Sequence, residues 1–261
     1  MSGPAHVSPA FTGAAHPVAQ AEPARPLSVV IPTYNERKNV QILIPAIQRV
    51  FEQNGIDGEI VVVDDNSNDG TKEVLADLAD RYSNLVVRIR SGPPSIARAW
   101  YEGFEIASKE NVVCIDGDLC HDPNYFPAML SQLDSNDLVI GSRYLGRSKL
   151  MEDKSWLASF ASFAGRFVTR LVTGFTETDT SHSFRMFKKV VFDRIKAQLK
   201  NEGNVFLIEF LIHAKKNGFR VIEIPIQYGK RIHGETKLRV FRESIRYLRY
   251  IITVVRMRLS S

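Results

Sequence analysis

The sequence predicts an α/β protein with a mainly parallel central sheet flanked by helices. Short apolar runs rich in β-branched residues alternate with segments of helical period, and this alternation is typical of parallel strands joined by right-handed crossovers. The chain has 261 residues, of which 44% are hydrophobic and 24% charged. That size and composition are sufficient for one substantial domain with its own core, and they argue against disorder for most of the length.

Five apolar runs are each long enough for one buried strand. They are Leu27–Ile31, Glu59–Val63, Leu85–Ile89, Val112–Ile115 and Asp137–Ile140. Between them, one helical stripe contains Val40, Leu43, Ile47 and Val50, and another contains Val74, Leu75 and Leu78. Further along, Phe184–Phe187 and Val221–Ile226 are predicted edge strands, and Gly203–Lys216 is a predicted helix beside them.

The flanking segments and the cysteines set further expectations. Residues 1–26 show no strand or helix period and lack the features of a signal peptide, so we expect a disordered tail. Residues 27–240 form the predicted main domain, and residues 241–261 a basic amphipathic helix. No apolar run reaches the length of about 18 residues needed to span a bilayer. Cys114 and Cys120 lack a metal-binding spacing, which predicts free thiols in a cytoplasmic protein. No nucleic-acid partner is expected.

Polar clusters follow three of the predicted strands. The first strand runs into Pro32–Glu36, the second into Asp64–Ser67 and the fourth into Asp116–Asp118. In open parallel sheets, ligands bind beyond the carboxyl ends of the strands. We therefore expect the functional site at this edge of the sheet.

Two of these clusters contain paired carboxylates. Asp116 and Asp118 can share one hard divalent cation, which would neutralise a departing diphosphate; the alternative is a capped turn before a helix opened by Asp122-Pro123. Asp64 and Asp65 suit a turn and cap before a helix at Thr71, or a carboxylate that accepts hydrogen bonds from a base or ribose. The residues alone leave both choices open.

Four segments in order resemble the GT-A nucleotide-sugar fold of family 2 glycosyltransferases, over roughly residues 27 to 240. They are Pro32–Glu36, Val63–Ser67, Asp116–Asp118 and Ile140–Tyr144. Within that family, Ile140–Tyr144 and Gly234–Leu238 look most like the polyprenol-phosphate sugar synthases, such as the dolichol-phosphate mannosyltransferases.

The resemblance implies roles for individual residues. The nucleoside pocket would be lined by Pro32, Tyr34 and Glu36, with Val63 and Asp65 holding the base or ribose. The diphosphate would be bound by Asp116, Gly117 and Asp118, with the two carboxylates as ligands of Mg²⁺ or Mn²⁺. Positive charge for the phosphates of donor or acceptor would come from Arg143, Arg231 and Lys237, which with Asp118 are the expected catalytic residues. Alternatively, Arg143 is an ordinary surface arginine and Lys237 a charge flanking a helix.

The sequence departs from the family pattern at three places. Cys120 stands where relatives often carry a glutamine as a further metal ligand, and its thiol is a soft group poorly suited to magnesium. Relatives usually show Asp-x-x-Ser-Gly-Phe, whereas the run that begins at Asp179 has His182 and Ser183 in place of the serine and glycine. His182 is either a solvated loop residue or a catalytic group. Gly92–Ser95 is stiffer than the usual glycine-rich loop and is expected to reshape the donor pocket.

The expected activity is transfer of mannose from GDP-mannose to a polyprenyl phosphate, with inversion, at the cytosolic membrane face. An ionised phosphate acceptor needs no strong base. The apolar stripe of the C-terminal segment consists of Ile245, Leu248, Ile252, Val255 and Leu259, bordered by Arg242, Arg246, Arg249 and Arg256. Such a stripe suits peripheral membrane contact or packing on the sheet. Trp156–Val172 is a second apolar surface, suited to a membrane, a lid or a homodimer face.

Two alternatives remain at this point. The same fold can serve a soluble hydroxyl acceptor, for which Asp179 and His182 are candidate bases at the acceptor site. A catalytically inactive nucleotide-binding module is the second, with Cys120 and Ser183 as marks of a degenerate site. A dinucleotide dehydrogenase is disfavoured because no GxGxxG motif follows the first strand.

Overall fold

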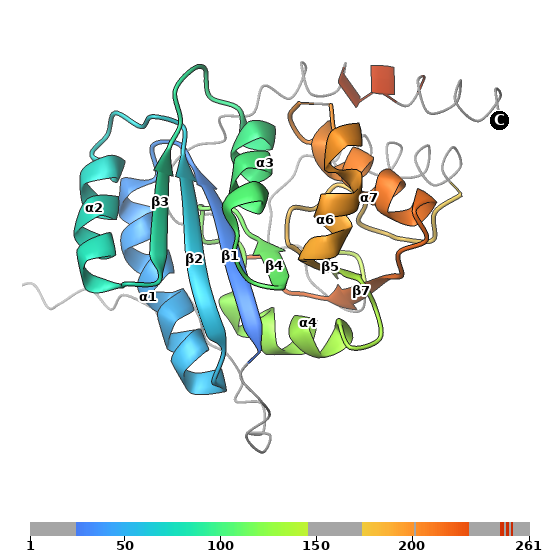
Figure 1. Cartoon of the computed structure of the whole chain (residues 1–261), viewed down its shortest axis with the longest axis horizontal. Helices are drawn as coiled ribbons and strands as arrows, with labels where there is room; N and C mark the ends of the chain where they lie inside the picture. The colour runs from blue at the N-terminus through green and yellow to red at the C-terminus, as the bar shows by residue number, and fades with distance from the viewer. Residues whose placement is uncertain are drawn as a thin grey trace, which may run out of the picture.

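The computed structural model describes residues 25–145, 174–200 and 202–229, together with residues 246, 247, 249, 250 and 252. Its strands form one seven-stranded sheet in the order β3-β2-β1-β4-β6-β5-β7 (Figure 1). They are β1 (Pro26–Thr33), β2 (Asp57–Asp64), β3 (Leu85–Ile89), β4 (Asn111–Cys114), β5 (Leu138–Ser142), β6 (Arg185–Lys188) and β7 (Val221–Pro225). The helices are α1 (Arg37–Asn54), α2 (Thr71–Arg81), α3 (Ile96–Ile106), α4 (Phe126–Gln132), α6 (Lys189–Ile195) and α7 (Val205–Lys216), with 3-10 turns η1 (Pro123–Tyr125) and η2 (Lys196–Gln198).

Parallel pairing aligns the ends of the first strands. β1 pairs with β2 from Pro26 opposite Asp57 to Thr33 opposite Asp64, so these two strands end at the same level. β4 lies parallel to β1 on its other side, and β3 lies parallel to β2. The polar segments that follow β1, β2 and β4 therefore meet at one edge, as the sequence predicts.

β6 corrects one sequence prediction. The run Phe184–Phe187 was expected at the edge of the sheet, but β6 lies between β4 and β5 and pairs antiparallel with both. Arg185, Met186 and Phe187 are fully buried, which fits an interior strand. An apolar run signals burial without giving the position of a strand in the sheet. β7 does lie at the edge, where it pairs parallel with β5.

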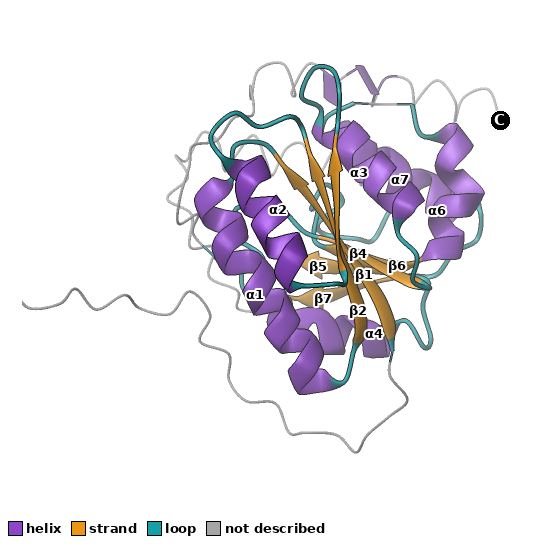
Figure 2. Ribbon diagram, turned by 60° about the vertical axis from the view of Figure 1, so that its left-hand side comes forward, coloured by secondary structure: helices purple, strands orange, loops and turns teal. Residues whose placement is uncertain are grey.

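The core lies on both faces of the sheet, and alternate residues of each strand serve opposite faces. Val29 and Ile31 of β1 pack with α1, α2 and α4, whereas Val30 packs with α3, α6 and α7. Figure 2 shows these two groups of helices on opposite sides of the strands. The result is a three-layer α/β/α arrangement that leaves the carboxyl ends of β1, β2 and β4 for a binding site.

The C-terminal segment packs on α7 at the residues that the structure describes. Tyr250 is buried, and with Tyr247 it lies against Val205, Ile208 and Ile212 of α7. Arg249 is exposed, and Ile252 of the predicted apolar stripe is 45% exposed. Most of the predicted tail and the whole of Trp156–Val172 lie outside the described residues. Within the described part of the chain, no helix has the length and apolarity that crossing a membrane requires.

Gly103 of α3 lies at a close approach of this helix to the sheet. A Cβ atom at this position would overlap the side chain of Val30 and lie 3.2 Å from Val63 Cγ2. We expect Gly103→Ala to lower the free energy of unfolding by about 2 kcal/mol, because overpacking costs up to about 3 kcal/mol and the helix preference of alanine offsets about 1. Urea unfolding measures the change. Glu105→Ala on the exposed side of α3 is the control, and a more stable Gly103→Ala protein would contradict this packing.

Candidate active site at the carboxyl ends of the strands

The loops after β1 and β2 are joined by hydrogen bonds. Thr33 Oγ1 donates to Asp64 Oδ2 at 2.9 Å, and the Asp65 peptide N–H donates to the Thr33 carbonyl at 2.9 Å. Asp64 Oδ1 also accepts from the peptide N–H of Ser67 at 2.7 Å. Asp64 is fully buried, so its carboxylate builds the turn and is not available to a ligand.

Asp65 is also engaged within the protein. Its carboxylate forms an ion pair with Arg90 and accepts from the peptide N–H of Ser95 at 2.7 Å. Arg90 Nε in turn donates to Glu102 Oε1 at 2.9 Å. Burial raises the pKa of Asp65, although the Ser95 N–H and Arg90 favour its charged form. Ser95 thus brings the Gly92–Ser95 loop to this carboxylate.

The Asp116–Asp118 segment lies directly over the end of β1. A Cβ atom on Gly117 would lie 3.3 Å from the Pro32 carbonyl oxygen and 3.7 Å from Glu36 Cγ. Asp118 Oδ1 accepts from the peptide N–H of Cys120 at 3.1 Å. The Asp116 side chain is 26% exposed, whereas Asp118 is nearly buried. The structure therefore brings the predicted diphosphate segment together with Pro32 and Glu36.

Val63 was predicted to contact the base or ribose, but its side chain does not face the strand-end site. Its side chain is fully buried and packs with Ala97, Trp100 and Phe104 on the α3 side of the sheet. Only its main chain is near the strand end, because β2 continues to Asp64. Tyr34 and Glu36, in contrast, are partly exposed in the loop after β1.

Arg143 is held by Asp179 in a bidentate ion pair. The distances from Asp179 Oδ2 to Arg143 Nε and from Oδ1 to Nη2 are 2.8 and 2.9 Å. Burial opposes the charged form of each group, but the hydrogen bonds and attraction within the pair together outweigh it. The pKa of Arg143 is therefore raised and that of Asp179 lowered. With 14% of its side chain exposed, Arg143 is not an ordinary surface arginine.

The loop that carries Asp179 is braced from two further strands. Glu223 of β7 accepts hydrogen bonds from the peptide N–H groups of Thr178 and Asp179, each at 2.7 Å. Arg185 of β6 is fully buried and donates to the carbonyls of Thr180 and His182 at 3.2 and 2.7 Å. Sequence reasoning did not identify Glu223, Arg185 or Arg90 at the site. The position of Arg90 directly after β3 was the one available signal.

His182 is buried, so its interpretation as a solvated loop histidine is wrong. Its Nδ1 lies 2.7 Å from the Gly141 carbonyl oxygen, and its Nε2 lies 3.1 Å from Nε2 of His121. His121 Nδ1 accepts from the peptide N–H of Asp116 at 3.0 Å. Burial lowers the pKa of His121 to about 4 and that of His182 well below its usual value. Both imidazoles are therefore neutral at physiological pH.

The residues suited to a cation are Asp116 and Asp118. Mg²⁺ is usually held by one or two carboxylates together with substrate phosphates, and oxygen ligands also suit Mn²⁺. In the described ranges, no three His, Cys, Asp or Glu side chains gather around one point, so a bound diphosphate would have to supply further ligands. The Cys120 thiol is nearly buried, and both cysteines are free thiols as expected. Arg231 and Lys237 lie outside the described residues.

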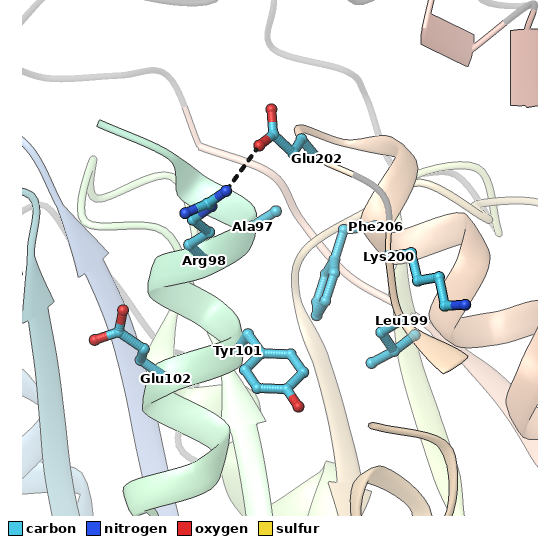
Figure 3. A pocket seen from close by; sticks show the side chains of 8 residues that line it. All are labelled: Ala97, Arg98, Tyr101, Glu102, Leu199, Lys200, Glu202 and Phe206. Carbon is cyan, nitrogen blue, oxygen red and sulfur yellow. Dashed lines mark hydrogen bonds and ion pairs between the residues drawn. The ribbon is translucent and has the colours of Figure 1, made fainter. Parts of the chain in front are cut away.

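A separate pocket of about 320 Å³ opens between α3 and the segment that leads into α7 (Figure 3). Its lining consists of Ala97, Arg98, Tyr101, Glu102, Leu199, Lys200, Glu202 and Phe206. None of the residues predicted to bind the donor lines this pocket. Glu102 connects this pocket to the strand ends described above, through Arg90 and Asp65.

Comparison with other proteins reveals similar sequences. A dolichol-phosphate mannosyltransferase of Pyrococcus furiosus is 32% identical over 237 residues, which cover 88% of this chain and 64% of that protein. The chain thus spans slightly less than two thirds of that relative. A polyprenol monophosphomannose synthase of Mycolicibacterium smegmatis is 29% identical over 232 residues, covering 87% of this chain and 86% of that protein.

Solved structures show the same fold. Glucosyl-3-phosphoglycerate synthase of Mycobacterium tuberculosis, in complex with Mn²⁺, UDP and phosphoglyceric acid, matches with a TM-score of 0.63 and 18% identity. The match covers 88% of this chain and 77% of that chain. The same enzyme with Mg²⁺ and UDP matches with a TM-score of 0.61. This likeness confirms the GT-A fold that the sequence pattern predicts.

The family follows from a match over most of the chain. The family model described as glycosyl transferase family 2 matches residues 28–196, a range that runs from within β1 past β6 and contains the segments Pro32–Glu36 and Asp116–Asp118. This chain belongs to glycosyl transferase family 2.

Proposed function

We propose that this chain transfers mannose from GDP-mannose to a polyprenyl phosphate, with inversion at the anomeric carbon. The observation that carries the proposal is the pairing of a carboxylate segment, Asp116–Asp118, with a charged arginine fixed nearby. Tyr228 is close to both: Arg143 Cζ lies 5.4 Å from the Tyr228 ring centroid, and burial together with the negative charges of Asp118 and Asp116 raises the pKa of Tyr228. The names of the two relatives above support the choice of mannose and of a polyprenyl acceptor.

The donor would lie across the ends of β1 and β4. Tyr34 and Glu36 would contact the nucleoside, and the peptide groups around Gly117 would approach the diphosphate. Asp116 and Asp118 would hold Mg²⁺ or Mn²⁺, which when bound neutralises the charge that develops on the leaving diphosphate. Arg143, kept charged and oriented by Asp179, would attract the phosphate of the acceptor or donor. Arg231 and Lys237 are proposed as further phosphate contacts.

The state of the candidate bases favours a phosphate acceptor over a soluble hydroxyl compound. A hydroxyl group needs a base within hydrogen-bond reach. Asp179 is 1% exposed and is occupied by Arg143, and His182 is 3% exposed with both ring nitrogens engaged. An ionised phosphate can attack without such a base once it is correctly oriented.

An inactive nucleotide-binding module receives less support. Ser183, one of the two residues that would mark a degenerate site, donates to Asp116 Oδ2 at 2.8 Å. Cys120 supports Asp118 through its peptide N–H. Both substitutions thus leave the two carboxylates at the strand ends.

Contact with the cytosolic membrane face is part of this proposal. Tyr247 and Tyr250 pack on α7, which leaves Arg249 and Ile252 exposed on the C-terminal segment. An exposed isoleucine near an arginine suits the headgroup boundary of an anionic bilayer. The acceptor itself would be drawn from that bilayer. A 27–240 catalytic domain followed by a 241–261 membrane-binding helix remains the proposed organisation.

The test of the function is transfer of label from GDP-mannose to a short polyprenyl phosphate. We expect product in the organic phase with Mn²⁺ or Mg²⁺, and a loss of at least about a hundredfold in Asp118→Ala, because stabilisation of the leaving diphosphate disappears. Asp77→Asn on the exposed side of α2 is the control and should be fully active. Donor hydrolysis without any labelled lipid would reject the lipid acceptor.

Asp179→Asn tests whether Asp179 orients Arg143 or acts as a general base. The amide keeps the shape of the side chain but removes the charge that fixes Arg143. We expect kcat/KM to fall about tenfold, whereas removal of a general base costs roughly 10²- to 10⁴-fold. A decrease above a thousandfold in a variant that is still folded at the assay temperature would instead favour the base.

Ile252→Asn tests the membrane contact. Burial of one isoleucine contributes about 1.5–3 kcal/mol, so we expect affinity for anionic vesicles to fall about tenfold or more in a sedimentation assay. Ile106→Asn is the matched control, since Ile106 at the end of α3 is 41% exposed, close to the 45% of Ile252. Equal binding of both variants and the unaltered protein would exclude Ile252 from the contact.

A further inference from the structure

Two hydrogen-bonded links tie Asp116 to the loop that carries Asp179. The first begins at the Asp116 peptide N–H, passes through His121 and His182, and ends at the Gly141 carbonyl, with successive distances of 3.0, 3.1 and 2.7 Å. The second is the hydrogen bond from Ser183 Oγ to Asp116 Oδ2 at 2.8 Å. One link holds the main chain of Asp116, and the other holds its carboxylate.

The first link has a single consistent direction. A peptide N–H can only donate and a carbonyl can only accept, so His121 Nδ1 accepts and His182 Nδ1 donates. Because a neutral imidazole has one donor and one acceptor, His121 Nε2 must donate to His182 Nε2. All four ring nitrogens are then satisfied, and the chain of hydrogen bonds runs unbroken from Asp116 to Gly141.

Packing around the two imidazoles keeps them away from any substrate. His121 is 1% exposed and stacks on Phe184 with ring centroids 4.9 Å apart. Tyr228 contacts both rings, at centroid distances of 5.5 Å to His121 and 5.3 Å to His182. These histidines can therefore influence a reaction only through the groups to which they bond.

Two residues of these links, His182 and Ser183, form one of the three places at which the sequence departs from the family pattern. His182 and Ser183 stand where Asp-x-x-Ser-Gly-Phe has serine and glycine. Glycine has no side chain to contact Asp116, and serine is too short to replace an imidazole that spans from Gly141 to His121. Ser183 thus adds a direct contact to Asp116, and His182 adds a contact to His121, which in turn bonds to Asp116.

We propose that His182 and Ser183 are positioning residues that fix the main chain and the carboxylate of Asp116 for a divalent cation bound with the donor diphosphate. This inference deepens the proposed function and rests on its metal-bound diphosphate. Groups that hydrogen-bond a metal ligand from outside orient it, and their loss typically weakens metal affinity by about 10- to 100-fold. His121 transmits the effect of His182 to the Asp116 peptide.

The experiment measures Mn²⁺ binding in the presence of GDP, from the electron paramagnetic resonance signal of free Mn²⁺. Ser183→Ala removes only the hydroxyl, and His182→Asn keeps a donor for the Gly141 carbonyl but cannot reach His121. We expect each to weaken Mn²⁺ binding about tenfold. His182→Gln places an amide oxygen toward His121 Nε2 and should recover most of the affinity. Ser181→Ala is the control, since no contact of Ser181 with Asp116 or His121 occurs in the described part of the chain.

Two further measurements exclude a merely structural effect. Thermal unfolding should show each variant folded, and GDP binding in the presence of a chelator should match that of the unaltered protein. Mn²⁺ affinity that is unchanged in both Ser183→Ala and His182→Asn would overturn the proposal. Equal losses in His182→Asn and His182→Gln would overturn the part played by His182.

The same assay distinguishes this inference from the function on which it builds. The expected differences in Mn²⁺ binding, found in a protein that labels no polyprenyl phosphate, would support the positioning of Asp116 and reject the acceptor. Normal lipid transfer with identical Mn²⁺ binding in all variants would reject the positioning alone.

Discussion

Asp179 and Arg143 form an ion pair that is largely removed from water, and each depends on the other to stay charged there. Removal of one partner from a buried pair leaves an uncompensated charge, which typically costs about 3–5 kcal/mol. Two parallel hydrogen bonds give this pair a fixed geometry as well as energy. The chain segment after β5 is thereby attached to the loop before β6, and the other contacts of the site are arranged around that attachment.

The loop before β6 connects elements that parallel topology alone would leave separate. It meets β7 through Glu223, β5 through Gly141, the segment after β5 through Arg143, and the segment after β4 through His121 and Asp116. Buried polar networks of this kind rigidify a site when every member is satisfied. Sugar transfer from a nucleotide-sugar donor needs fixed charges in the site. A leaving diphosphate is stabilised best when the charged groups of the protein are already in place before the reaction. The rigid loop and the proposed chemistry are thus consistent.

Sequence reasoning succeeded where the signal was local. β1, β2 and α7 lie within two residues of the predicted ranges, because each has an apolar period of its own. The gathering of Pro32, Glu36 and Asp116–Asp118 followed from parallel topology. Sequence reasoning failed for the position of β6, because that interior position depends on pairing with strands distant in sequence.

The partners of charged groups were equally hidden. The residues around Asp65 in the sequence do not indicate that Arg90 is its partner, and those around Asp179 do not indicate Glu223. His182 lies 61 residues from His121, the imidazole to which it bonds. By residue type alone, His182 was a candidate catalytic group. Burial lowers its pKa and keeps it neutral, and it links His121 to the Gly141 carbonyl. Asp64 and Asp65 illustrate the same limit, since both carboxylates of this pair are engaged within the protein.

The most direct test of the central claim is a crystal structure with Mn²⁺ and GDP, in which anomalous scattering locates the metal. Our account predicts a manganese peak between the carboxylates of Asp116 and Asp118 and the diphosphate, with the His121–His182 hydrogen bond retained. A manganese peak remote from these carboxylates, or a diphosphate bound in the pocket between α3 and α7, would contradict it.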